Sequence, residues 1–161
     1  MKHWNNRPFD VANLYNPAYL GRILVEYIDS YKIATKKGIP LEIIYVTFPL
    51  IIVKSLQKRL PKKSNAIFHK WLIENSDLKF NYFNTVIQYL PFIKEAIIFL
   101  LQRNIIALEK NTLRINKQIR KTLKSDTNEI KQTLKKASFM GKWVAKIDDS
   151  EVIYSLMEVQ V

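Results

Sequence analysis

The feature of the sequence that most constrains its fold is an apolar run, "IIYVTFPLIIV", from Ile43 to Val53. The run is about half as long as the roughly 20 residues that a membrane-spanning helix needs, and it contains Pro49. Its first half is apolar on every side of a helix, so we expect other elements to bury it at the centre of the core. Because proline lacks an amide hydrogen, Pro49 should kink or divide this helix.

Composition indicates a globular protein of one domain. The 161 residues are 48% hydrophobic and 12% aromatic, which is ample material for a core. The lack of cysteine excludes a disulfide framework, a thiolate nucleophile and a zinc ribbon. The opening "MKHWNNRPFD" is polar where a secretory signal would be apolar. We therefore expect a cytoplasmic protein that does not enter a membrane.

Helical patterns flank the apolar run. After an N-terminal arm with turns, apolar residues recur at spacings of three and four from Asn16 to Gly38, with a proline inside the start and a glycine past the end. This pattern predicts an amphipathic helix. A second helix is predicted from Pro40 to Leu60, and a third, capped by Ser64, over 65–75.

The middle of the chain, 64–117, is predicted to form a winged helix-turn-helix-like unit. A fourth helix is expected from Tyr82 to Leu90, and a fifth, in the position of a recognition helix, from Pro91 to Arg103. The segment "IIALEKNTLRIN" has two β-compatible runs about Asn111, which predict a hairpin.

The predicted fold class is therefore mainly α with a small β-hairpin, in a single domain that spans 1–161. The N-terminal arm and helices occupy 1–63, and C-terminal helices and a tail occupy 118–161. These last helices are expected in two parts, separated near Ser125 and Asp126, where an N-cap is plausible. The final residues are compatible with a short strand or with a docked tail.

Groups that could carry catalysis are few. His3 and His69 lie far apart and belong to no metal-ligand pattern, and the acidic cluster at Asp148 to Glu151 is typical of a solvated turn. The sequence contains neither a P-loop nor a dinucleotide-binding glycine motif. We therefore predict a protein that is not an enzyme and has no cofactor or metal.

The strong positive charge suggests an anionic partner. The formal net charge is +12, and two stretches, 54–70 and 110–124, are basic with no acid between their cations. Such residues can contact DNA phosphates without reading sequence, although a solvated basic surface is an equal alternative. The DNA-backbone candidates are Lys54, Lys58, Arg59, Lys62, Lys63, Arg114, Lys117, Arg120, Lys121 and Lys124.

The predicted fifth helix argues against reading of bases. It is apolar over most of its length, whereas a helix in the major groove needs an exposed face rich in hydrogen-bond donors. Because so many apolar residues cannot all face one core, some of them should cover a neighbouring element or contact a partner protein. Lys94, Ile98 and Leu101 are the candidates on this helix for a partner interface.

Four stretches resemble a known family in the right order: "WNNRPFDVANLYNPAYLGRILVEYI", "LPKKSNAIFHKWL", "PFIKEAIIFLLQ" and "ASFMGKWVAKIDDSEVIYSLMEVQV". They are similar to the middle component of bacterial ABC three-component systems, the group that includes Lamassu-type defence. The positions that match are Trp4, Asn5, Asn6, Arg7, Pro8, Asn13, Asn16, Pro17, Gly21, Gly141 and Trp143. The chain ends in "MEVQV", where family members often have a Gly-Val-Arg-Pro-like tail.

The resemblance implies a small non-catalytic subunit that accompanies an SMC-like coiled-coil ATPase and an effector, often a nuclease, in defence against phage or plasmids. It adds Trp4, Asn5, Arg7, Pro8, Asn16, Gly141 and Trp143 to the partner-interface candidates. Gly141 is expected to let the last helix pack closely against the N-terminal arm or a partner. The leading hypothesis is an adaptor with double-stranded DNA contact in the assembled complex, and the alternative is a free-standing winged-helix transcriptional regulator.

Overall fold

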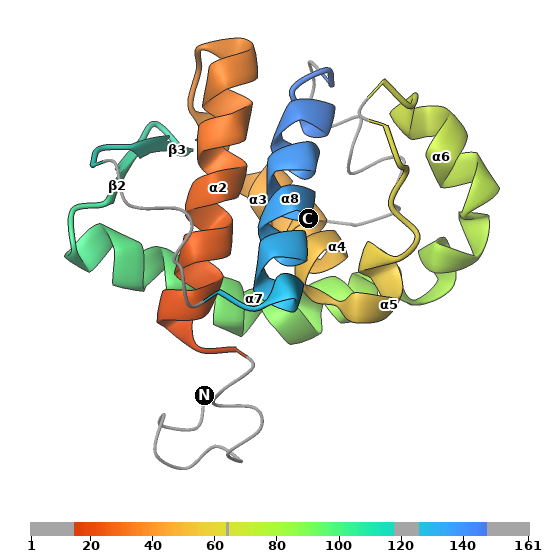
Figure 1. The fold of residues 1–161 in the computed structure, drawn as a ribbon, viewed down its shortest axis with the longest axis horizontal. Coiled ribbons are helices and arrows are strands. Elements are labelled where there is room, and N and C mark those ends of the chain that lie inside the picture. Colours follow the sequence, from red (N-terminus) through yellow and green to blue (C-terminus); the bar gives the residue numbers. More distant parts are fainter. Residues whose placement is uncertain (1–14, 64, 118–125, 148–161) are drawn as a thin grey trace.

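The computed structural model describes residues 15–63, 65–117 and 126–147. Two helices, α2 (Pro17–Thr35) and α8 (Asn128–Val144), lie side by side at the centre of the molecule (Figure 1). The long helix α7 (Lys79–Gln102) crosses near their lower ends, a small sheet lies beside α2, and α6 (Phe68–Glu74) flanks α8 (Figure 1). The predicted class, mainly α with a β-hairpin, is confirmed for this part of the chain.

The first predicted helix is confirmed as α2. The Asn16 side chain caps it by accepting a hydrogen bond from the backbone amide of Ala18 at 2.8 Å, and Pro17 occupies the first turn. Lys36, with φ 63°, takes the left-handed conformation that ends the helix, so this role does not fall to Gly38.

The apolar run is buried and divided as predicted. It forms α3 (Leu41–Thr47) and α4 (Pro49–Ile52), and α5 (Lys54–Gln57) follows after the extended residue Val53. The side chains of Ile44, Phe48, Leu50 and Ile51 are completely shielded from solvent. These short helices therefore form the centre of the core.

The predicted boundary at Pro91 is wrong, because α7 continues through this proline without a turn. Pro91 removes one backbone hydrogen bond, but it lies half-buried on the outer side of the helix, near the exposed Ile87, where a freed carbonyl can meet water. The inner side of α7 packs on the same core before and after the proline, through Tyr82, Val86, Ile93, Ile97 and Leu100. This continuous burial holds the two halves as one helix.

The predicted third helix begins later than expected. Ser64 lies outside the described residues, and α6 starts at Phe68 after Ile67, which makes no side-chain capping bond. A short 3₁₀ turn, Ser76–Leu78, then leads directly into α7.

The predicted hairpin is confirmed and acquires a third strand. Strands β2 (Ile106–Glu109) and β3 (Thr112–Ile115) pair antiparallel, and their turn residues Lys110 and Asn111 both have positive φ, as a type I′ turn requires. Strand β1 (Ile39–Pro40) pairs with β3, so the strand order is β1-β3-β2. Two residues from the 1–63 region thus complete the sheet.

Helix α8 begins one residue later than the predicted cap. Thr127 is the N-cap, and its side chain accepts a hydrogen bond from the amide of Ile130 at 3.3 Å. The preceding Asp126 is buried and forms two hydrogen bonds with the guanidinium of Arg22, at 3.0 and 2.8 Å. The start of α8 is therefore fixed to α2 by an ion pair.

Candidate interaction surfaces

The outer face of α7 carries large apolar side chains that the described part of the chain leaves exposed. Phe80 is 91% exposed, Ile87 and Ile98 are each 51% exposed, and Phe83 is 38% exposed. Together with the exposed Lys94, these residues are separated along the chain by three, four, seven and four positions. Because these spacings match the turns of a helix, all five lie on one side of α7. We call Phe80, Phe83, Ile87, Lys94 and Ile98 the outer stripe.

By length and composition alone, Phe80–Gln102 could cross a membrane. The prediction that the protein does not enter a membrane considered the apolar run at Ile43 and did not consider this segment. Only 28% of the 18-residue apolar window within it is buried, yet its inner side packs on the core of the fold. The outer stripe is therefore one uncovered side of a core helix, and this side is available to a partner.

The structure places the predicted partner-interface residues in three different environments. Lys94 and Ile98 lie on the outer stripe, and the half-buried Leu101 follows them on the same side of α7. Asn16 caps α2. Trp4, Asn5, Arg7 and Pro8 lie outside the described residues.

Gly141 and Trp143 are interior residues that contact other elements of this chain. A Cβ on Gly141 would lie 2.5 Å from the carbonyl oxygen of Tyr27, because α8 packs tightly on α2. The indole of Trp143 is 1% exposed and stacks among other rings, including Phe68 and Trp71, at centroid distances of 5.0 and 5.2 Å. Both residues hold elements of this chain together.

Three of the predicted DNA-backbone cations have acidic partners from elsewhere in the fold. Lys54 pairs with Glu129 of α8 at 2.6 Å, Arg59 with Asp77 at 2.7 Å, and Arg114 with Glu109 at 3.3 Å. The hydrogen bond with Glu129 raises the pKa of Lys54. Glu129 and Asp77 are distant in sequence from their partners, and Glu109 lies across the hairpin from Arg114. The spacing of cations along the basic stretches therefore does not reveal these pairs.

The other predicted cations are exposed or lie outside the described residues. Lys58, Lys62, Lys63 and Lys117 are exposed. Arg120, Lys121 and Lys124 fall in the segment 118–125, which the structure does not describe.

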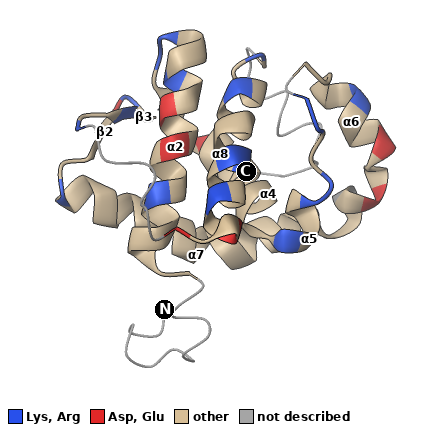
Figure 2. Ribbon diagram, in the orientation of Figure 1, with Lys and Arg blue, Asp and Glu red and all other residues tan. Residues whose placement is uncertain are grey.

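A set of lysines that was not among the predicted cations lies on α8. Lys131, Lys135 and Lys142 are exposed, and their spacings of four and seven residues place them on one side of the helix. In Figure 2 basic residues are seen on α8 and on the segment between α5 and α6. The helical spacing of the three lysines on α8 can be read from the sequence.

A cleft of about 500 Å³ lies between α2, α5, α7 and α8. Its lining includes Tyr15, Tyr89, Lys58 and Gln132. The hydroxyl groups of Tyr15 and Tyr89 form a hydrogen bond at 3.1 Å, and burial, followed by this bond, raises the pKa of Tyr15 to about 12. The phenol of Tyr15 therefore loses its proton only at a pH above that of an ordinary tyrosine.

Metal ligands do not gather in the part of the chain that the structure describes. Among residues 15–63, 65–117 and 126–147, no group of three His, Cys, Asp or Glu side chains could hold a metal ion.

A family model described as ABC-three component (ABC-3C) system Middle Component 3 matches residues 4–161. The chain belongs to this family. The match covers nearly the whole sequence, and so it confirms the resemblance to the middle component that the terminal stretches indicated. Searches of curated proteins and of solved structures found no match. As a Middle Component 3, the chain is one part of a system that has other components.

Proposed function

We propose that this chain is a non-catalytic adaptor of a bacterial defence complex of the Lamassu type. It bridges an SMC-like coiled-coil ATPase and a nuclease-like effector in the cytoplasm, and the assembled complex contacts double-stranded DNA. Membership in a middle-component family supports the existence of partner subunits. The net charge of +12 supports an anionic ligand.

The outer stripe of α7 is the observation that carries the adaptor proposal. It extends for about 27 Å from Phe80 to Ile98, given a rise of about 1.5 Å per helical residue. Burying each large apolar side chain stabilises a contact by roughly 1.5 to 3 kcal/mol, so a partner that covers the stripe gains substantial affinity. A long apolar strip of this shape fits a helix of a partner protein.

Lys94 defines the chemistry of this partner more closely. It lies within the outer stripe, with Nζ 6.0 Å from the centre of the Tyr45 ring, and it has no acidic partner among the described residues. A partner helix with an acidic residue among apolar ones would match both features. A coiled-coil protein offers such helices.

The elements match the winged unit predicted at 64–117 only in part, since α6, a 3₁₀ turn and the single helix α7 precede the hairpin. Helix α2, strand β1, further helices and the hairpin follow one another, and β1 joins the hairpin by pairing with β3. Because α7 has no turn at Pro91, its second half is not a separate recognition helix. This continuity favours the adaptor over the free-standing regulator.

A co-purification experiment tests the adaptor proposal. The double variant Ile87→Glu, Ile98→Glu should lose the companion ATPase or the effector when the three components are expressed together. The matched control is Ile33→Glu, Leu108→Glu, which charges two apolar residues of similar exposure, 58% and 49%, on other elements. The control should retain both companions.

Two outcomes would contradict the proposal. If both double variants kept both companions, the outer stripe would not be the docking surface. If the unaltered chain floated with phospholipid vesicles and the stripe variant did not, the partner of α7 would be a membrane instead of a protein.

A further inference from the structure

Six exposed lysines lie on two segments of the chain that a hydrogen bond from Trp143 of α8 to the carbonyl of Ala66 brings together. Three lie on α8, at Lys131, Lys135 and Lys142, and three lie in the segment that leads from α5 toward α6, at Lys58, Lys62 and Lys63. None of the six has an acidic partner within residues 15–63, 65–117 and 126–147. We call these six residues the lysine face.

Two tryptophans hold the two parts of the lysine face in place. The indole N–H of Trp71 donates to the carbonyl of Arg59 at 2.8 Å, and the indole N–H of Trp143 donates to the carbonyl of Ala66 at 2.6 Å. Lys62 and Lys63 lie between these two anchored carbonyls. These two bonds hold the carbonyls on either side of Lys62 and Lys63, which lowers the entropic cost of binding.

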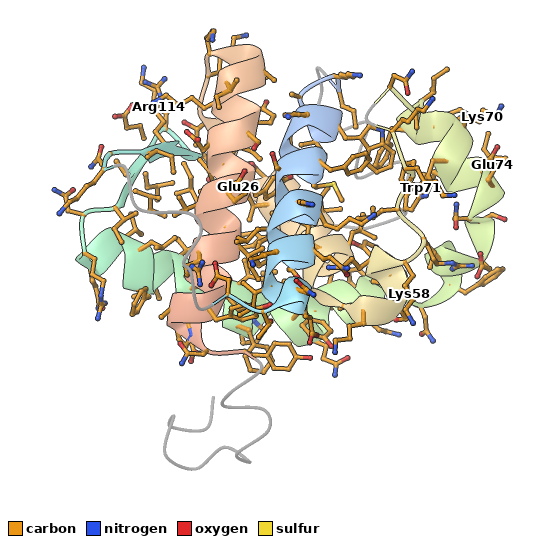
Figure 3. All side chains as sticks on the ribbon, viewed as in Figure 1. Glu26, Lys58, Lys70, Trp71, Glu74 and Arg114 are labelled. Carbon is orange, nitrogen blue, oxygen red and sulfur yellow. The ribbon has the colours of Figure 1, made fainter. Side chains whose placement is uncertain are left out.

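The charges that surround the lysine face limit its extent. Lys70 lies on the outer side of α6 with Glu74, while Trp71 lies on the inner side, so Lys70 does not extend the face (Figure 3). Glu26 on α2 lies at the other border, where it accepts a hydrogen bond from Ser30 at 3.3 Å (Figure 3). Glu129, the only acid on α8, pairs with Lys54.

We propose that the lysine face binds the phosphate backbone of double-stranded DNA. On α8, Lys131 and Lys142 are about 16 Å apart along the axis, given a rise of about 1.5 Å per residue. This span exceeds the major groove, which is about 12 Å wide, so the ends of the array reach phosphates on both strands. Lysine binds phosphate as a point charge without the fork geometry that arginine uses to read guanine, so the contact is independent of sequence.

Other anionic partners fit the lysine face less well. Single-stranded nucleic acid would require exposed aromatic side chains as stacking platforms, and the exposed Phe80 and Phe83 lie on α7 instead. An acidic protein would require an apolar centre within the basic rim, whereas the large apolar residue between these lysines on α8, Phe139, is half-buried. Duplex DNA requires only the exposed charges.

The inference extends the DNA contact of the proposed function and assigns it to a face that is distinct from the outer stripe. It is tested on the full chain with a duplex of arbitrary sequence by measuring the dissociation constant over a range of salt concentrations. The triple variant K131Q/K135Q/K142Q should reduce the slope of log K against log salt by about 2.7, because each lost phosphate contact removes about 0.9.

The matched control is K110Q/R114Q/K117Q, which removes the same charge from the hairpin and the residue that follows it. This control should keep the slope of the unaltered chain. Thermal unfolding verifies that both variants are folded. If both variants reduced the salt slope equally, the effect would be one of net charge alone. If only the hairpin variant reduced the slope, the contact would lie on the hairpin. Either result would overturn the assignment.

Competition identifies the class of ligand. Duplex DNA should displace a labelled duplex more effectively than single-stranded DNA or polyglutamate of equal charge, and equal displacement by either competitor would overturn the proposal. The K131Q/K135Q/K142Q variant should still co-purify with the companion subunits, because its outer stripe is intact. Failure of the DNA contact is thus distinguishable from failure of the adaptor proposal.

Discussion

Gly141 of α8 lies directly against the backbone of Tyr27 in α2. A Cβ atom at Gly141 would be 2.5 Å from the carbonyl oxygen of Tyr27 and 2.8 Å from the amide nitrogen of Tyr31. The hydroxyl groups of Ser30 and Ser138 join the same two helices by a hydrogen bond of 2.8 Å. The glycine therefore sets the close approach of the central helix pair, around which the rest of the core is arranged.

Gly141→Ala should destabilise the fold by up to about 2 kcal/mol. Alanine has a higher helix propensity than glycine by about 1 kcal/mol, but overpacking against a backbone that cannot yield costs about 1 to 3 kcal/mol and requires the helices to separate. Urea unfolding measures the change.

Gly21→Ala is the matched control for Gly141→Ala. Its new Cβ would meet only side chains, with the nearest atom of Leu100 at 3.1 Å, so the effect should be smaller. A Gly141→Ala protein as stable as the unaltered chain would contradict the packing role of this glycine.

Asp126→Asn should destabilise the protein by about 3 kcal/mol, within the range for breaking a buried pair by removing one partner. The Asp126 side chain is 3% exposed and holds Arg22 at 2.8 Å. Asp77→Asn, in the exposed pair with Arg59, is the control and should change the stability by less than about 1 kcal/mol. Equal effects of the two substitutions in urea unfolding would show that burial of Asp126 is not decisive.

The sequence predicts this fold well where the cause is local and poorly where the cause is a distant contact. The helix start with Pro17 in its first turn, the division near Pro49 and the turn at Asn111 each depend on neighbouring residues, and each is confirmed. The continuity of α7 depends on a core that packs along its whole inner side, which overrides the local preference of Pro91.

The same distinction applies to the candidate surfaces. The exposure of Lys94 and Ile98 could be predicted, because the sequence shows more apolar residues on this helix than one core can bury. The pairing of Lys54 with Glu129 and the pairing of β1 with β3 join segments far apart in the chain. The spacing of residues along the chain carries no information on such contacts. It therefore cannot show which cations have acidic partners.

Stability should fall as pH rises above about 10, the usual tyrosine pKa. Burial raises the pKa of Tyr27 and of Tyr82, whose hydroxyl groups bond Thr47 and the carbonyl of Val46, each at 2.6 Å. Both tyrosines stay protonated in the folded state while the unfolded chain loses its protons. Their contribution is complete below the unfolded pKa and is lost as pH rises toward the folded pKa.

Urea unfolding at a series of pH values from about 8 to about 11 measures this alkaline loss, to which each tyrosine adds up to about 1.4 kcal/mol per pH unit. Tyr27→Phe should reduce the slope of stability against pH, whatever its cost at neutral pH. Tyr19→Phe, which removes a hydroxyl group from a half-buried position of the same helix, is the control. An unchanged slope in Tyr27→Phe would show that this hydroxyl ionises as easily in the folded state as in the unfolded state.

Trp143→Phe should release the segment that carries Lys62 and Lys63. Phenylalanine keeps most of the aromatic packing with Phe68 and Trp71 but lacks the N–H that donates to the carbonyl of Ala66. The lost hydrogen bond leaves a carbonyl without its donor, which costs about 1 to 3 kcal/mol. Limited trypsin digestion should therefore cut the variant after Lys62 or Lys63 sooner than the unaltered chain, with cleavage after the exposed Lys117 as the internal control. If the two proteins were cut at the same rate, the indole would not be what holds this segment, and preorganisation of the lysine face would need another cause.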